Sequence, residues 1–208
     1  NTYAFFVLYA EIDKYNPAEY DLKKCKLTLM DKWVLSKLNT LIKTVDDGLK
    51  DYKIFETART IQDFTDELSN WYVRRGRERY WGKDMAAAYT TLYTVLVTLA
   101  KVCAPYVPFM TESMYRNLVT PFYKDAPESV HLCDFPVADE SLIDPELEKG
   151  MEDVLEIVVL GRAARNGSNV KNRQPLKKLY IATDRKVNLT EELYGIARDE
   201  LNVKEFEI

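Results

Sequence analysis

Apolar residues recur at alternating steps of three and four along most of the chain, the spacing that gathers them on one face of an α-helix. This pattern predicts the end of a helix over residues 1–12 and further helices over about residues 28–51, 54–81, 84–104, 109–119 and 144–166. Gly82 is a candidate C-cap for the third of these segments. Within the short fifth helix, Met110 is expected to point into the core. These amphipathic stripes predict a bundle in which neighbouring helices bury their apolar faces against one another.

The pattern changes after residue 120, where three prolines interrupt the next twenty residues. Residues 129–135 (SVHLCDF) are predicted to form an extended segment across the bundle. His131 lies inside this apolar segment, so we expect it to be a satisfied structural histidine rather than a metal ligand.

Near the C-terminal end the period shortens from that of a helix to that of a strand. Residues 178–183 and 203–208 are predicted strands, and residues 190–202 between them are a predicted helix. The predicted fold class is therefore mainly α: an antiparallel helical bundle over residues 1–168, with a small β-α-β module over residues 175–208.

Residues 68–81 (LSNWYVRRGRERYW) concentrate aromatic and cationic side chains in one predicted helix. On a 3.6-residue period, an apolar stripe runs through Ile54, Ala58, Ile61, Thr65, Leu68 and Tyr72 and continues into Arg75 and Arg79. A second face carries Asn70, Arg74, Arg77 and Trp81. Planar cations beside aromatic rings can hold unstacked RNA bases and phosphates. The alternative is an ordinary core helix whose arginines reach the surface or pair with nearby carboxylates.

The charge distribution limits the possible partners of the chain. A net charge of −4 argues against a protein that coats nucleic acid indiscriminately. Two local clusters depart from this average: residues 74–79 hold four arginines against one acid, and residues 161–182 hold six basic residues and no acid. Either cluster could bind an anion, or could be a solvated face that serves solubility.

Several kinds of chemistry have no support in the sequence. The three cysteines are odd in number and widely spaced, which predicts neither a disulfide framework nor a metal site and suits a reducing compartment such as the cytoplasm. The glycines form no phosphate loop, and no nucleophile motif is present, so we expect no catalytic residue here. The longest unbroken apolar run, residues 3–10, is too short to span a membrane. Because the chain begins at Asn1 without a methionine, we expect it to be a piece of a longer protein.

Residues 68–81 resemble the signature helix of the anticodon-binding domain of isoleucyl-tRNA synthetases, which are class I aminoacyl-tRNA synthetases. Other segments resemble the same family in the same order: NTYAFFVLYA its first bundle helix, CAPYVPFMTESMYRNL its proline-broken junction, SVHLCDFP its crossing segment, and VKNRQPLKKLYIAT the stretch that leads into its small module. These segments cover nearly all of the 208 residues. The valyl-tRNA synthetases share this bundle with a less arginine-rich helix and are the alternative family.

The resemblance implies a parent ligase that uses ATP, with magnesium, to activate isoleucine and transfers it to tRNA(Ile). It implies catalytic and editing domains upstream, no metal or cofactor in this piece, and no membrane partner. The resemblance and the charge pattern together give these candidate tRNA-binding residues: Asn70, Trp71, Arg74, Arg75, Arg77, Arg79, Tyr80, Trp81, Lys171, Arg173, Lys177 and Lys178. The alternative function is a structural module that docks the other domains of the parent chain without contacting RNA.

Overall fold

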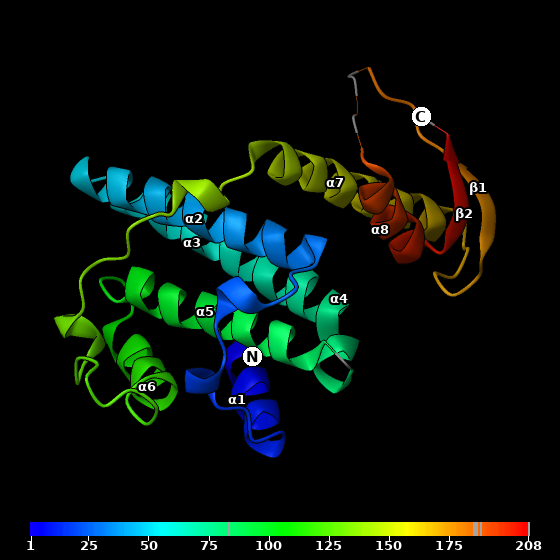
Figure 1. Ribbon diagram of the computed structural model, residues 1–208. Helices are drawn as coiled ribbons and strands as arrows, with labels where there is room; N and C mark the ends of the chain where they lie inside the picture. The colour runs from blue at the N-terminus through cyan, green and yellow to red at the C-terminus, as the bar shows by residue number, and fades with distance from the viewer. Residues whose placement is uncertain (83, 185–186, 188, 208) are drawn as a thin grey trace. The chain divides into compact units, whose positions relative to one another are not determined.

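The computed structural model describes residues 1–82, 84–184, 187 and 189–207 (Figure 1). The chain divides into two compact units, Asn1–Ile143 and Asp144–Ile208. The predicted fold class is confirmed, because the first unit is a helical bundle and the second contains a small parallel sheet. The sequence predicted a domain boundary between residues 168 and 175, which differs from this division. The structure instead groups the helix over Pro145–Gly167 with the small module, because that helix packs against the helix of the module.

The first unit consists of these principal helices: α1 (Thr2–Ile12), α2 (Leu29–Lys50), α3 (Ile54–Glu67), α5 (Met85–Cys103) and α6 (Pro108–Leu118). α2 and α3 lie side by side, and α5 packs against α1, α2 and α6 (Figure 1). α5 supplies the centre of the core, with Tyr89, Leu92 and Val95 fully buried. By length and composition α5 could cross a membrane, but 72% of its apolar window is buried inside the bundle, as expected of a core helix.

Short 3-10 turns connect these helices: η1 (Pro17–Glu19), η2 (Leu22–Lys24), η5 (Val130–Leu132) and η6 (Glu140–Leu142). The expected extended segment over residues 129–135 therefore contains a helical turn. Glu112 fixes this turn by accepting hydrogen bonds from the Ser129 hydroxyl at 2.8 Å and the Val130 amide at 3.0 Å. Val130 is the residue that this turn buries, while His131 is exposed. The prediction that Met110 points inward was wrong, because Met110 is exposed. The side chain of His131, predicted to be a satisfied structural histidine, is exposed as well.

The predicted 54–81 helix is continuous in the chain but not regular. α3 is followed by one π-helical segment, η3 (Leu68–Val73), a single α-turn, α4 (Arg74–Gly76), and a 3-10 segment, η4 (Arg77–Trp81). Three consecutive residues of η3, Trp71–Val73, are buried against the bundle. Within α3, before the π segment, the predicted apolar stripe failed in part, because Ile54 and Thr65 are exposed while Thr57 and Phe64 are buried.

One buried carboxylate joins α2 to this irregular segment. Asp31 accepts hydrogen bonds from both terminal nitrogens of Arg79 at 2.8 Å and from the Tyr72 hydroxyl at 2.6 Å. The same carboxylate completes a capping box at the start of α2 by accepting from the Thr28 amide at 2.8 Å. Burial alone would raise the pKa of Asp31, but the hydrogen bonds from Arg79 and Tyr72 outweigh it and hold that pKa below its usual value. Asp31 is therefore charged, and its pairing fixes the position of η4 on the bundle.

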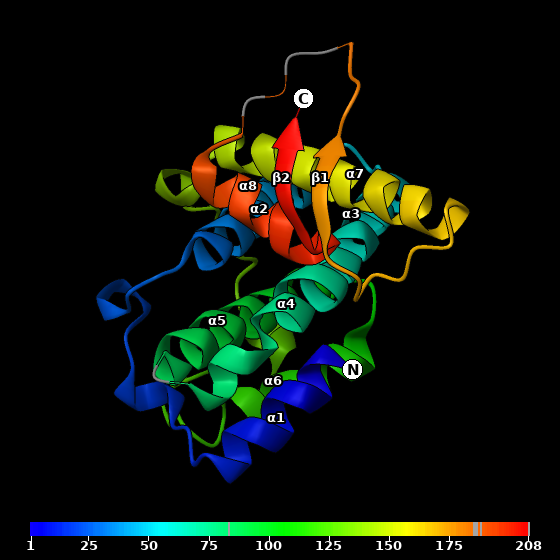
Figure 2. The same ribbon diagram turned by 90° about the vertical axis from the view of Figure 1, so that its right-hand side faces the viewer.

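The second unit is a β-α-β module with one additional helix, as Figure 2 shows. Its elements are α7 (Pro145–Gly167), β1 (Leu176–Tyr180), α8 (Glu191–Leu201) and β2 (Val203–Glu207). β1 and β2 pair in parallel, with Leu176 opposite Val203. The predicted β-α-β unit is confirmed, although its first strand begins two residues earlier than predicted. Ile208, the last residue of the second predicted strand, lies outside the described residues.

Two glycines let α8 approach α7 closely. A Cβ atom at Gly150 would lie 2.6 Å from a methyl carbon of Leu193, and one at Gly161 would lie 2.6 Å from a methyl carbon of Leu201. Both leucines are almost fully buried, so they have little room to move away. Glycine at these two positions therefore sets the helix spacing of the module.

We expect the substitution Arg79→Met to lower the free energy of unfolding by about 3–5 kcal/mol, because it leaves a buried carboxylate without its ionic partner. Chemical denaturation followed by circular dichroism measures this change. The matched control is Glu140→Gln, which removes the partner of Lys43 in an exposed ion pair and should leave the unfolding midpoint unchanged. Equal effects of the two substitutions would contradict the structural role assigned to Asp31 and Arg79.

Candidate nucleic-acid interface

The structure divides the eight candidate residues of the 70–81 stretch into exposed, half-buried and buried residues. Asn70, Arg74, Arg77 and Trp81 are exposed, and they are the four residues that helical spacing placed on one face. We call these four residues the arginine–tryptophan face. The indole of Trp81 is 55% exposed, which leaves most of its ring accessible to a partner.

Side chains of α1 hold the arginine–tryptophan face in place. The guanidinium carbon of Arg77 lies 5.6 Å from the centre of the Phe5 ring, within the range of a cation–π contact. The Trp81 ring meets the edge of Tyr9, with ring centres 5.3 Å apart and an interplanar angle of 84°. Sequence reasoning missed these supports, although Phe5 and Tyr9 share the four-residue spacing of Arg77 and Trp81. The two pairs belong to separate helices, and only the fold brings them together.

Arg74 is supported within its own helix. Its Nε atom donates a 2.8 Å hydrogen bond to the carbonyl oxygen of Asn70, and its guanidinium carbon lies 5.9 Å from the centre of the Trp71 ring. Its side chain remains exposed. Two arginines of the face thus lie beside aromatic rings, which restricts their side-chain freedom, and both residues are exposed.

The structure corrects three predicted contact residues, two by their burial and one by its ion pair. Trp71 and Tyr80 are 3% and 1% exposed, so neither ring can stack on a base without a rearrangement of the core. Tyr80 packs edge-on against Phe5 and Tyr89, with ring centres 5.1 Å and 5.0 Å away. Both terminal nitrogens of Arg79 bind Asp31, so this arginine is structural. Arg75, another candidate, is half-buried.

In the second basic cluster, residues 161–182, ion pairs distinguish structural cations from candidate RNA contacts. Arg162 pairs with Glu200, and Lys178 pairs with Glu207, which raises the pKa of Lys178. The remaining candidates, Lys171, Arg173 and Lys177, are exposed. Within the described part of the chain, no carboxylate lies in ion-pair range of Lys171, Arg173, Lys177 or, in the first unit, Arg77. These four cations are therefore available to an external anion.

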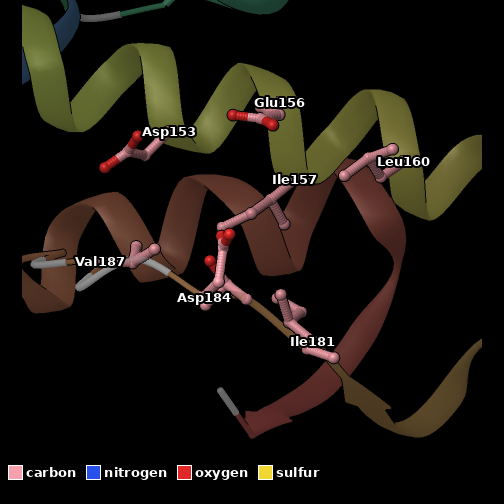
Figure 3. Close-up of a pocket in the computed structure, with 9 residues that line it drawn as sticks. Asp153, Glu156, Ile157, Leu160, Ile181, Asp184 and Val187 are labelled. Atoms are coloured by element: carbon pink, nitrogen blue, oxygen red, sulfur yellow. The ribbon is translucent and has the colours of Figure 1, made fainter.

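A pocket of the second unit lies apart from all of these candidate residues. It has a volume of about 520 Å³ and lies between α7 and the segment that follows β1 (Figure 3). Asp153, Glu156 and Asp184 line it together with aliphatic side chains such as Leu160 and Ile181. Three carboxylates disfavour a phosphate group or any other polyanion. The candidate interface is consequently a set of exposed side chains and not this pocket.

The comparisons with known proteins identify the family of the chain. Residues 31–181 match the family described as the anticodon-binding domain of tRNA ligase. The chain is similar over its whole length to isoleucine–tRNA ligases from Clostridium novyi and Clostridium acetobutylicum, each 54% identical, and to isoleucine–tRNA ligase 2 from Bacillus cereus, 46% identical. It spans about 20% of the length of each of these relatives.

The match covers most of the bundle, including the whole arginine–tryptophan face. The similarity to isoleucine–tRNA ligases confirms the resemblance that the 68–81 stretch indicated and favours the isoleucyl family over the valyl alternative. The chain belongs to the anticodon-binding domain family of tRNA ligases, and it corresponds to that domain of the isoleucine–tRNA ligases.

Proposed function

We propose that this chain holds the anticodon stem-loop of tRNA(Ile) within an isoleucine–tRNA ligase. The observation that carries the proposal is the arginine–tryptophan face, where one irregular helix carries two exposed arginines and an exposed tryptophan, and α1 supports Arg77 and Trp81. The names of the relatives supply the amino acid and the class of reaction. The parent ligase would activate isoleucine with ATP and magnesium in the cytoplasm, in domains outside this chain.

Each part of the face has a role that suits a folded RNA hairpin. Arg74 and Arg77 contact phosphates, for which the planar guanidinium offers paired donors. Trp81 offers a stacking surface to a base that is splayed out of the loop. Asn70 carries an amide that can both donate to and accept from a base or a ribose. The aromatic supports from α1 limit the motion of Arg77 and Trp81 before binding, which reduces the entropy lost when RNA binds.

We expect the double substitution Arg74→Gln and Arg77→Gln to make tRNA binding less dependent on salt. If both arginines neutralise phosphates, the slope of log K against log salt concentration should fall in magnitude by about 1.4–1.8, since each contact contributes about 0.7–0.9. Binding of a tRNA(Ile) transcript at several salt concentrations measures this slope.

The matched control for this experiment is Arg59→Gln on α3. Arg59 is also an exposed arginine over an aromatic ring, 4.6 Å from the centre of Phe55, but it lies outside the proposed face. Its loss should leave the slope close to that of the wild type. An unchanged slope in the double variant would remove Arg74 and Arg77 from the binding site.

Trp81→Ala should weaken binding of the tRNA(Ile) anticodon hairpin by about 5- to 150-fold, the range expected for the loss of one base–aromatic stack. The affinity for a fully paired RNA duplex should change little, because a duplex offers no splayed base. Phe55→Ala is the control, since Phe55 is another exposed aromatic residue of the same unit. Equal losses for hairpin and duplex would show that Trp81 does not stack on an unpaired base.

A second candidate function, docking of another domain of the parent chain, is favoured by α1. Leu8 and Ile12, one helical turn apart, are 55% and 63% exposed. If this surface is the main function, the chain should bind the rest of the ligase in trans, and Leu8→Asp with Ile12→Asp should abolish that binding. The chain should then show no preference for tRNA(Ile) over unrelated RNA, which separates this function from the first.

A further inference from the structure

Arg165 is a buried arginine with an unusual set of partners. Although it is 4% exposed, no carboxylate lies in ion-pair range of it among the residues that the structure describes. One terminal nitrogen donates 3.0 Å hydrogen bonds to the carbonyl oxygens of both Lys171 and Gln174. The other donates to the carbonyl oxygens of Leu201, at 2.6 Å, and Asn202, at 3.2 Å. Backbone dipoles therefore offset this buried charge, and the guanidinium links the 171–174 loop to the end of α8.

Asn202 also binds the same loop. It ends α8 in the left-handed conformation, with φ 49° and ψ 52°. Its amide nitrogen donates to the carbonyl oxygen of Arg173 at 3.0 Å and lies 3.4 Å from that of Asn172. Its own carbonyl oxygen accepts from the amide of Leu176 at 3.0 Å, which joins the end of the loop to β2.

Two side chains thus bind the carbonyl oxygens of four consecutive residues, 171–174. Since these oxygens face Arg165 and Asn202, the loop backbone is fixed by contacts of the second unit alone. The side chains of Lys171, Arg173 and the neighbouring Lys177 are exposed. The result is a fixed backbone that presents cations without internal partners among the described residues.

We propose that residues 171–177 form a preorganised phosphodiester-binding element, which we call the basic loop. Lys171, Arg173 and Lys177 make the contacts, and Arg165 and Asn202 are positioning residues that hold the backbone beneath them. This proposal rests on the proposed function, because the phosphodiester is that of the bound tRNA. A fixed loop loses less conformational freedom on binding than a mobile loop with the same charges, and it binds more tightly for that reason.

The contacting and positioning residues are expected to differ in how their loss affects salt dependence. Lys171→Gln with Arg173→Gln should reduce the magnitude of the salt slope for tRNA(Ile) by about 1.4–1.8. Asn202→Gly keeps every charge and suits the left-handed backbone, but it removes the amide donor. It should therefore weaken binding about three- to tenfold at each salt concentration and leave the slope unchanged. Arg165→Lys, which keeps the charge but loses the forked donors, should act in the same direction.

The matched control is Asn169→Gly, because Asn169 also has a left-handed backbone, with φ 54°, and lies just outside the basic loop. It should bind tRNA(Ile) like the wild type. Circular dichroism establishes that each variant is folded. If Arg165→Lys does not fold, Asn202→Gly still tests the proposal.

Any one of three results would overturn the basic-loop proposal. The first is wild-type affinity in folded Asn202→Gly, and the second is an unchanged salt slope in the Lys171 and Arg173 double variant. The third is a loss of affinity in Asn169→Gly equal to that in Asn202→Gly. If the basic-loop proposal fails but the Arg74 and Arg77 substitutions still reduce the salt slope, the proposed function remains supported. Failure of the wild-type chain to prefer tRNA(Ile) over unrelated RNA would instead defeat the proposed function, and the loop proposal with it.

Discussion

The buried carboxylate of Asp31 is the constraint on which the arrangement of the bundle surface depends. A charge without solvent must be neutralised and hydrogen-bonded, and Asp31 takes Arg79, Tyr72 and the start of α2 as its partners. Once Arg79 is directed inward, the 3-10 geometry of η4 determines its neighbours. Residues three apart eclipse in such a helix, and Arg77 and Tyr80 accordingly both contact Phe5. The pairing of Arg79 with Asp31 therefore also positions the exposed Arg77.

Both units separate cations that stabilise the fold from cations that face solvent. In the bundle Arg79 is neutralised by a carboxylate, whereas in the module Arg165 is satisfied by four backbone carbonyl oxygens. Arg79 and Arg165 each fix the backbone beneath an exposed cation that has no ion pair within the described residues, Arg77 in one case and Arg173 in the other. A count of basic residues along the sequence does not distinguish these two classes, since the distinction depends on partners that are distant in sequence.

The sequence predicted features that depend on residues close together in the chain and missed those that depend on residues far apart in it. Helical spacing depends on neighbours three and four residues apart, so it predicted the helices and placed Asn70, Arg74, Arg77 and Trp81 on one face. It placed Arg79 on the continuation of the apolar stripe but could not predict the ion pair of Arg79 with Asp31, which lies 48 residues earlier. The π turn also escaped prediction, because no local pattern specifies it. The bonds of Arg165 to Leu201 and Asn202 were missed for the same reason.

The acidic character of the chain is consistent with a small number of well-placed cations. Each phosphate contact strengthens binding to any RNA, and a surface rich in cations would therefore bind RNA without regard to its shape. With a net charge of −4, most of the surface gives no such general attraction. Affinity must then come from RNA whose phosphates and splayed bases match the positions of a few fixed groups, and phosphate contacts serve mainly to set orientation. The rigid supports under Arg77, Trp81 and the basic loop follow from this requirement, because a few contacts discriminate between RNA shapes only if they cannot move to suit each one.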